Sequence, residues 1–239
     1  MNVSHQYRNK YFSVLGDSIS TLSGYSKPEE AVFYHGMNKL EADVFAPADT
    51  WWGQVIELLD GRLLINDSFS GSMVTKRRDC IYPSYGCSDE RTSALHNCYA
   101  TPDVIMVYLG TNDWGCGAQP LPEAEEQAND LTVFSVAYTE MLKKLRANYP
   151  DTEIWCFTLA VSTYSAHPDF AFPYRYRKRH IAEYCEVIRD CARSQGCRLI
   201  DLYEGAEPYD TVDGFHPNRQ GMQTLSAAVI SELAKGDAI

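Results

Sequence analysis

The sequence predicts a three-layer α/β/α sandwich built around a parallel sheet of about five strands. Short apolar runs bounded by turn residues alternate along the chain with segments whose apolar residues recur at helical spacing. This alternation is typical of parallel βαβ units. The apolar runs contain few polar positions, so helices are expected to cover both faces of the sheet.

The expected strands are YFSVL, LLIND, DVIMVYL, EIWCFTL and CRLIDL, at 11–15, 63–67, 103–109, 153–159 and 197–202. The expected helices lie at 49–60, 123–148, 174–195 and 218–235. Trp51 and Trp52 stand at the start of the first helix, after Pro47 and Asp49, and the Asp49 carboxylate could cap that helix. Segments 20–48 and 72–100 show neither pattern, and long loops of this kind usually form lids or pocket walls.

Length and composition favour one globular domain over residues 1–239, with 45% hydrophobic and 22% charged residues. The formal net charge of −11 disfavours a nucleic-acid partner, which needs a basic surface. The first residues lack the apolar run of a signal peptide, and no stretch reaches the ~18 apolar residues of a membrane helix. We therefore expect a cytoplasmic protein without a membrane partner. The oligomeric state is left open.

One basic run interrupts the acidic chain, and it consists of Arg175, Arg177, Lys178, Arg179 and His180. We interpret it as the solvated first turn and side of the expected helix at 174–195. The alternative is that the run faces an anionic group of a substrate.

The eight cysteines are scattered without a CxxC pair, which favours free thiols in a reducing compartment. An alternative is a disulfide or a zinc site in the loop that holds Cys80, Cys87, Cys98 and His96, although their spacing matches no zinc template.

Ligands of parallel α/β sheets bind beyond the carboxyl ends of the strands, so the residues that follow each apolar run are the first candidates for chemistry. Four of these ends carry polar or glycine residues: GDS at 16–18, SFSG at 68–71, GTND at 110–113, and a loop leading to DGFHP at 213–217.

Acyl transfer by serine needs a nucleophilic hydroxyl, a neutral imidazole to take its proton, and a carboxylate to orient the imidazole. Ser18 follows Gly16, where the chain can turn sharply, and Asp213 and His216 are three residues apart in one turn. Each feature alone has an ordinary structural interpretation: a surface turn for the Asp-His pair, and turn residues for Asn112 and Gly71. Their joint occurrence at successive strand ends favours catalysis.

These blocks resemble those of the SGNH hydrolase superfamily, also called the GDSL esterases and lipases. The resemblance implies a flavodoxin-like fold, with Ser18 as nucleophile, His216 as base and Asp213 as the acid. It further implies an oxyanion hole formed by the N–H groups of Ser18 and Gly71 and by the side chain of Asn112. Neither a metal nor a cofactor is implied. After GDS the sequence departs from the longer family motif and continues ISTLSG.

The expected activity is hydrolysis of small acyl esters, for example acetyl groups on carbohydrates, because charged residues interrupt the segments that could line a long acyl tunnel. Alternatives are a thioesterase or lysophospholipase acting on longer chains, and a non-catalytic carbohydrate-binding module on the same scaffold. Trp114 and His167 follow strand ends and are candidates for substrate contact. No GxSxG elbow, P-loop or complete GxGxxG motif competes with this interpretation.

Overall fold

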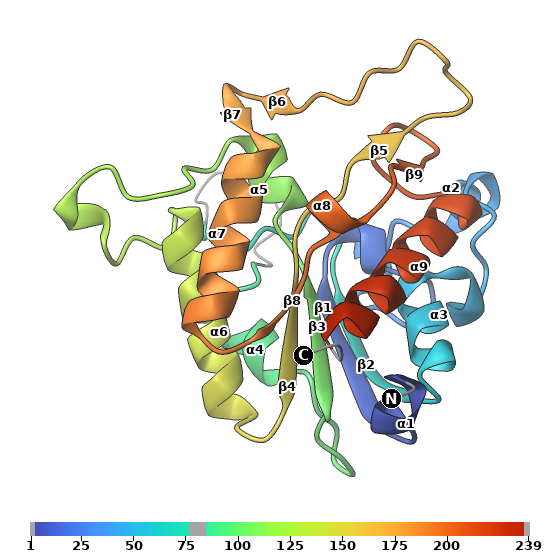
Figure 1. Cartoon of the computed structure of the whole chain (residues 1–239), viewed down its shortest axis with the longest axis horizontal. Coiled ribbons are helices and arrows are strands. Elements are labelled where there is room, and N and C mark those ends of the chain that lie inside the picture. Colours follow the sequence, from blue (N-terminus) through green and yellow to red (C-terminus); the bar gives the residue numbers. More distant parts are fainter. Residues whose placement is uncertain (1–2, 77–84, 237–239) are drawn as a thin grey trace.

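The structure is a computed structural model that describes residues 3–76 and 85–236. Its centre is a five-stranded parallel sheet with the strand order β2-β1-β3-β4-β8 (Figure 1). The strands are β1 (Tyr11–Gly16), β2 (Arg62–Ser68), β3 (Val104–Tyr108), β4 (Glu153–Phe157) and β8 (Arg198–Ile200). This sheet confirms the predicted fold class, and each expected strand is present.

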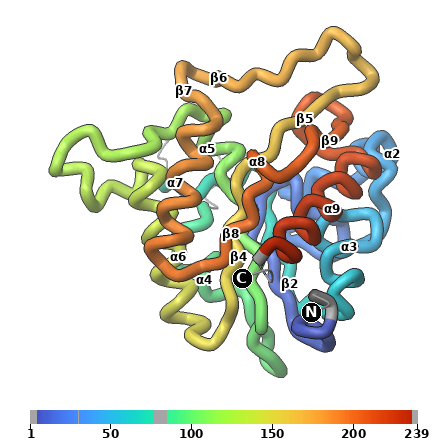
Figure 2. Tube along the Cα trace, in the orientation of Figure 1, coloured from blue at the N-terminus to red at the C-terminus, as the bar shows by residue number. Residues whose placement is uncertain are grey.

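Helices cover both faces of the sheet, as the traces in Figures 1 and 2 show. One face carries α1 (Val3–Tyr7), α3 (Trp51–Leu58) and α9 (Arg219–Gly236), and the other carries α4 (Asp89–Ser93), α6 (Phe134–Asn148) and α7 (Ile181–Ser194). The shorter helices are α2 (Gly36–Glu41), α5 (Thr111–Cys116), α8 (Leu202–Gly205) and the 3₁₀ turns η1 (Ser18–Ser20), η2 (Glu29–Ala31), η3 (Pro47–Asp49) and η4 (Glu125–Gln127). Outside the main sheet, β5 (Ser162–Thr163) pairs with β9 (Tyr209–Asp210), and β6 (Arg175–Tyr176) pairs with β7 (Arg179–His180).

Successive residues of the central strands pack into two different cores. Phe12 and Val14 of β1 belong to the core under α3 and α9, whereas Leu15 belongs to the core under α6 and α7. The residues of β3 alternate in the same way and are all buried. Side chains of a strand point to opposite faces in turn, so a sheet covered on both sides needs apolar residues at every position.

The strand order predicts a crevice beside β1. This strand lies between β2 and β3, so the chain builds on one side of β1 first and then crosses to the other side. In open parallel sheets such a reversal separates the loops at the carboxyl ends of the two neighbouring strands, and ligands bind there. The relevant loops here follow β1 and β3.

Two of the four helix predictions are wrong at their amino-terminal ends. Residues 123–133 form η4 and turns, and α6 begins only at Phe134. Residues 175–180 form the β6–β7 hairpin instead of a first helical turn, because Arg177 and Lys178 have φ angles of +45° and +71° that no helix accommodates. His180 precedes α7 and caps it, since its Nδ1 accepts the Ala182 N–H at 3.1 Å.

The cap of α3 also differs from the prediction. Thr50 is the capping residue, and its Oγ1 accepts the Gly53 N–H at 3.1 Å. The Asp49 carboxylate instead accepts the N–H groups of Phe45 and Ala46, each at 2.9 Å, and so closes the turn before the helix. Thr50 thus caps α3 itself, whereas Asp49 caps the preceding 3₁₀ turn, η3.

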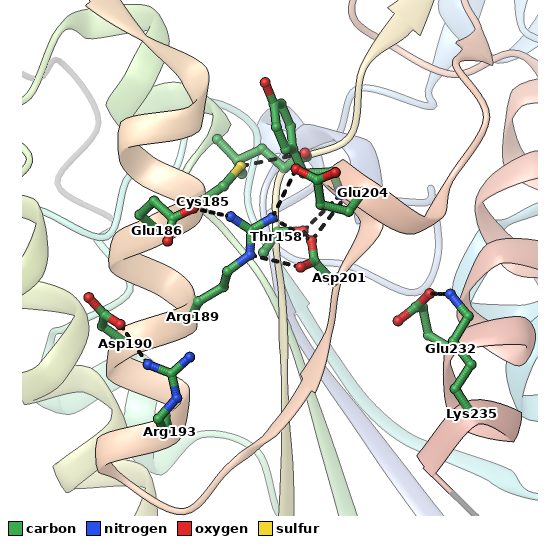
Figure 3. Close-up of polar contacts among 12 residues, drawn as sticks. Thr158, Cys185, Glu186, Arg189, Asp190, Arg193, Asp201, Glu204, Glu232 and Lys235 are labelled. Atoms are coloured by element: carbon green, nitrogen blue, oxygen red, sulfur yellow. Dashed lines mark hydrogen bonds and ion pairs between the residues drawn. The ribbon is translucent and has the colours of Figure 1, made fainter. Parts of the chain in front are cut away.

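A partly buried ion pair fixes the point where the chain leaves β8 (Figure 3). Arg189 of α7 donates from Nε and Nη2 to the Asp201 carboxylate, at 2.7 and 3.0 Å, and Thr158 donates to the same group at 2.8 Å. Burial alone would raise the pKa of Asp201, but these hydrogen bonds hold it below its ordinary value. Asp201 also caps α8, so this contact anchors the start of the segment that leads to residues 209–218.

The segments without an assignment are largely part of the packed molecule. Leu22, Tyr34 and Val44 lie in the first core, and Val74 and Leu95 lie in the second. Residues 77–84, which include Cys80 of the expected cysteine-histidine loop, lie outside the described residues.

The cysteines, the possible metal ligands and the helices of the described residues can be compared with what the sequence predicted. The thiols of Cys87, Cys156 and Cys185 are buried and form no disulfide. Within residues 3–76 and 85–236, no three His, Cys, Asp or Glu side chains are grouped so that they could hold a metal ion. Over the same residues, no helix has both the length and the apolar character needed to cross a membrane.

Replacing Thr50 with Ala should lower the free energy of unfolding by about 1 kcal/mol, because the Gly53 N–H at the start of α3 loses its acceptor. Urea unfolding monitored by circular dichroism measures this change. Thr50→Ser keeps the hydroxyl and is the matched control, so it should retain most of the stability. Equal stabilities of Thr50→Ala and Thr50→Ser would contradict the capping role.

Candidate active site

The chain turns sharply where it leaves β1, and Ser18 stands in this turn. Gly16 ends the strand at a position that excludes any side chain, since a Cβ there would lie 2.7 Å from the Cβ of Ser20 and 2.7 Å from the Oγ of Ser68. Ser18 begins η1 directly afterwards and is 7% exposed. The close approach of strand and turn therefore holds Ser18 at the carboxyl edge of the sheet.

Side chains from neighbouring elements fix the end of the same turn. The indole N–H of Trp51 donates to the Ser20 hydroxyl at 3.2 Å, and that of Trp52 donates to the Ser20 carbonyl at 2.9 Å. Asn66 of β2 also donates to the Ser20 carbonyl, at 2.9 Å. Both indoles are buried, so the start of α3 supports the Ser18 turn as well as the core.

A chain of hydrogen bonds links Ser18 to two residues near the carboxyl terminus. The His216 Nε2 lies 2.9 Å from the Ser18 Oγ, and the His216 Nδ1 lies 2.6 Å from the Asp213 Oδ2. The second Asp213 oxygen accepts the backbone N–H groups of His216 and Phe215, at 2.8 and 3.0 Å. One turn therefore delivers both the imidazole and the carboxylate that orients it.

The carboxylate determines which imidazole nitrogen carries the proton. Burial alone would raise the pKa of Asp213, but the hydrogen bonds from the side chain and backbone of His216 and from the backbone of Phe215 hold it below its ordinary value. An ionised carboxylate only accepts hydrogen bonds, so Nδ1 of His216 is the donor. Nε2 of the neutral ring is then free to accept the Ser18 hydroxyl proton.

The loop at 20–48, expected from its length to form a lid or a pocket wall, contributes to this arrangement through two residues that no motif indicated. The ring of Phe33 stacks on the His216 imidazole, with ring centroids 3.6 Å apart and an interplanar angle of 9°. The neighbouring Tyr34 donates its hydroxyl to the Pro217 carbonyl at 2.8 Å. These two contacts hold the histidine turn against the Ser18 turn.

Asn112 and Gly71 come from the segments that follow β3 and β2. The Asn112 Nδ2 donates to the Ser72 carbonyl at 2.9 Å, which brings the two segments together. Gly71 precedes Ser72 in a tight turn and has a φ of +77°, a conformation that favours glycine. Among the described residues, the N–H groups of Ser18 and Gly71 donate to no protein acceptor.

A cavity of about 250 Å³ opens at Ser18. Its walls consist of Ser18, Ile19, Thr111, Asn112, Trp114, Gly115, Tyr176, Phe215 and His216. Gly71 is not among these lining residues. The indole of Trp114 forms part of the wall and is held by a 3.3 Å hydrogen bond to the Arg179 carbonyl and by stacking on Phe172 at 5.5 Å.

The structure does not bring His167 to this cavity. His167 is exposed, and its ring lies 4.4 Å from that of Tyr164 in the loop after β5. It is absent from the cavity wall, where Tyr176 occurs instead. Position after a strand end was too weak a criterion, because the loop between β5 and β6 is long and leaves the sheet edge.

A buried arginine ties the Ser18 turn to β2 and to the Gly71 turn. Arg91 of α4 is 5% exposed and donates to the Gly16 carbonyl at 3.1 Å and to the Ser72 hydroxyl at 2.8 Å. Its Nε also lies 2.5 Å from an Asp67 carboxylate oxygen. No pattern in the sequence indicates this role, since Arg91 lies in a short polar helix.

Two carboxyl groups lie buried beneath the site. Asp17 accepts the Ile19 N–H at 3.0 Å, and Asp113 accepts N–H groups of Val74 and Thr75. Burial raises the pKa of Asp17 to about 7, opposed by the Ile19 hydrogen bond and by the charge of Arg91. Burial likewise raises the pKa of Asp113 to about 6, against the hydrogen bonds from Val74 and Thr75. Both groups hold backbone in place around the catalytic candidates.

Residues 10–164 match the family of GDSL-like lipases and acylhydrolases, a range that contains Ser18, Gly71 and Asn112. Among curated proteins, a cellulase/esterase of Acetivibrio thermocellus is 24% identical over 136 residues, which are 55% of this chain and 14% of that protein. This chain therefore spans only a small part of the length of that relative.

Solved structures share the fold of this chain over almost its whole length. A Bacteroides ovatus protein described as a GDSL-like lipase is 26% identical, with a TM-score of 0.71 over 95% of this chain and 99% of its own. A carbohydrate acetylesterase from Sinorhizobium meliloti, 14% identical, shares the fold with a TM-score of 0.63 over 95% of this chain and 99% of its own. The chain thus belongs to the GDSL-like lipase/acylhydrolase family of the SGNH hydrolases.

Proposed function

We propose that this protein hydrolyses small acyl esters with Ser18 as nucleophile, His216 as general base and Asp213 as the residue that orients His216. The observation that carries this proposal is the continuous hydrogen-bonded chain from the Ser18 hydroxyl through the imidazole to the Asp213 carboxylate. The serine of this chain borders an open cavity, so an ester can reach it.

In the first half of the reaction, the Ser18 Oγ attacks the ester carbonyl carbon and its proton moves to the His216 Nε2. The Asp213 carboxylate stabilises the resulting imidazolium. The tetrahedral intermediate then collapses: the bond to the alcohol oxygen breaks, that oxygen takes the proton from His216, and the acyl group remains on Ser18.

In the second half, water attacks the acyl-serine while His216 accepts the water proton. Collapse of the second intermediate returns that proton to the Ser18 oxygen and releases the carboxylic acid. The enzyme is restored, and no redox or group-transfer partner other than water is consumed.

The negative charge of both intermediates develops on the former carbonyl oxygen. The proposed donors to it are the N–H groups of Ser18 and Gly71 and the Asn112 amide. Their support is that the two N–H groups have no acceptor among the described residues, and that Asn112 lines the cavity beside Ser18. Donors held in place before the reaction stabilise this charge without reorganisation.

The small cavity favours a short acyl group. Its volume of about 250 Å³ lies below the roughly 300–1,000 Å³ of pockets that enclose drug-sized ligands. Trp114, Tyr176 and Phe215 give it aromatic walls, which suit a sugar ring or a short acyl chain. Because one structural relative is named a carbohydrate acetylesterase, acetylated sugars are the first natural substrates to assay.

A panel of p-nitrophenyl esters from acetate to palmitate tests this proposal. Acetate and butyrate should react fastest, and kcat/KM should fall beyond about eight carbons, because the further methylenes stay in water and gain none of the ~0.8 kcal/mol that each buried one provides. A steady rise toward palmitate would reject the small-acyl specificity and favour a thioesterase or lysophospholipase.

Purified Ser18→Ala protein is the control for the same panel. It should show no turnover above buffer, with an unchanged circular dichroism spectrum and melting temperature, since the change removes only one hydroxyl. Turnover equal to that of the wild type would exclude Ser18 as the nucleophile. A wild-type protein inactive on every ester, acetylated sugars included, would exclude the proposed activity.

Asn112→Ala should lower kcat by roughly 10²–10³, the usual cost of removing one oxyanion donor, with a smaller change in KM. Steady-state kinetics on p-nitrophenyl acetate measures both constants. Thr111→Ala, a change at the adjacent cavity residue, is the matched control and should leave kcat within a few-fold. If Asn112→Ala changed KM alone, Asn112 would be a binding residue and not an oxyanion donor.

A further inference from the structure

The β6–β7 hairpin lies above the carboxyl edge of the sheet, next to α5 (Figure 1). Arg175 pairs with His180 and Tyr176 with Arg179, and the two residues between them form the tip. Arg177 and Lys178 at this tip both have positive φ angles, in place of the glycine or asparagine usual there. Residues held in such an unfavourable backbone conformation gather at functional sites.

Two contacts attach the hairpin to the cavity wall. Tyr176 lines the same cavity as Ser18 and His216, with its ring 5.9 Å from that of Trp114. On the opposite strand, the Arg179 carbonyl accepts the Trp114 indole N–H at 3.3 Å. The hairpin is thus part of the cavity mouth and not a separate surface loop.

The tip also lies against α5. A Cβ on Gly117, the residue after this helix, would lie 2.9 Å from the Cβ of Arg177. Gly115, two residues earlier, lines the cavity. The stem of Arg177 is therefore seated beside the wall, and Arg177 is exposed.

The charges of the hairpin are unbalanced. Arg179 is paired with Glu123 at 3.1 Å and with Glu183 at 3.7 Å. Arg175, Arg177 and Lys178 are exposed, and none of the three forms an ion pair with any residue in 3–76 or 85–236. The hairpin of this chain, whose net charge is −11, therefore carries three cations without a carboxylate partner among the described residues, beside a cavity residue, Tyr176.

We propose that Arg175, Arg177 and Lys178 select an ester whose portion outside the cavity carries an anionic group, such as a carboxylate. This inference rests on the proposed function, because it concerns the same site. Guanidinium and ammonium groups bind carboxylate, phosphate and sulfate oxygens by charge-assisted hydrogen bonds. The aromatic wall then holds the neutral part of the substrate, while the hairpin holds its charge.

A matched pair of acetyl esters tests this selectivity: acetoxybenzoate, with its carboxylate meta or para to the ester, and the methyl ester of the same compound. The triple variant Arg175→Gln/Arg177→Gln/Lys178→Gln should lower the ratio of kcat/KM for the anionic ester to that for the neutral ester by roughly fivefold to tenfold, mainly through KM. Comparing ratios between proteins cancels the different intrinsic reactivities of the two esters. Added salt should lower the wild-type ratio and leave the variant ratio almost unchanged.

The control is Arg8→Gln/Arg193→Gln/Lys235→Gln, which changes the net charge equally. Arg8 precedes the start of β1, Arg193 lies in the last turn of α7 before β8, and Lys235 lies in the last turn of α9, so all three belong to segments at the opposite edge of the sheet. This control should keep the wild-type ratio. A hairpin variant with an unchanged ratio, or a control with an equal loss, would overturn the inference while the proposed esterase activity stands. A wild-type protein that hydrolyses neither ester would count against the proposed function itself, and this inference would fall with it.

Discussion

The site depends on one constraint, the position of β1 between β2 and β3 in a parallel sheet. Because all strands run the same way, the segments after these three neighbours emerge at the same edge. Ser18, Gly71 and Asn112 are far apart in the sequence and come from these three segments. The sheet therefore sets the distances between the candidate catalytic groups, and loops only complete the arrangement.

Polar groups buried beneath that edge give it a defined geometry. Arg91 reaches the backbone carbonyl of Gly16, the side chain of Asp67 and the hydroxyl of Ser72. A charge removed from water is costly unless it is paired and hydrogen-bonded, and Arg91 has both kinds of partner. Such a group tolerates few alternative backbone positions, which favours a preorganised site over a flexible one.

Local patterns predicted the parts of the structure that depend on local physics. Five apolar runs gave the strands, and the spacing of Asp213 and His216 within one turn made their contact predictable. Joint occurrence of the blocks at strand ends then identified the family. The strand order β2-β1-β3-β4-β8 was not predicted, because periodicity carries no information on which strands are lateral neighbours.

The remaining features depend on contacts between distant segments. Phe33 stacks on His216 and Arg91 contacts the Ser18 turn, but both come from segments without periodicity. The hairpin at 175–180 was expected to be helical as part of the segment 174–195 with helical spacing, and it contains no glycine, proline or asparagine that would have indicated a turn. Its packing on Trp114 overrides the local preference. Sequence position alone could not separate His167, which stays exposed, from Tyr176, which lines the cavity.

The central claim is that the Ser18 oxygen is an activated nucleophile. Reaction of the native protein with a fluorophosphonate, followed by mass spectrometry of the intact chain and its peptides, measures this directly. The phosphorus should bond to the Ser18 oxygen with release of fluoride, at one equivalent per chain and in step with the loss of esterase activity. Labelling should disappear when His216 is replaced by Ala, because the hydroxyl loses the base that accepts its proton. Complete loss of activity with the label on another residue, or full activity with Ser18 labelled, would contradict the account.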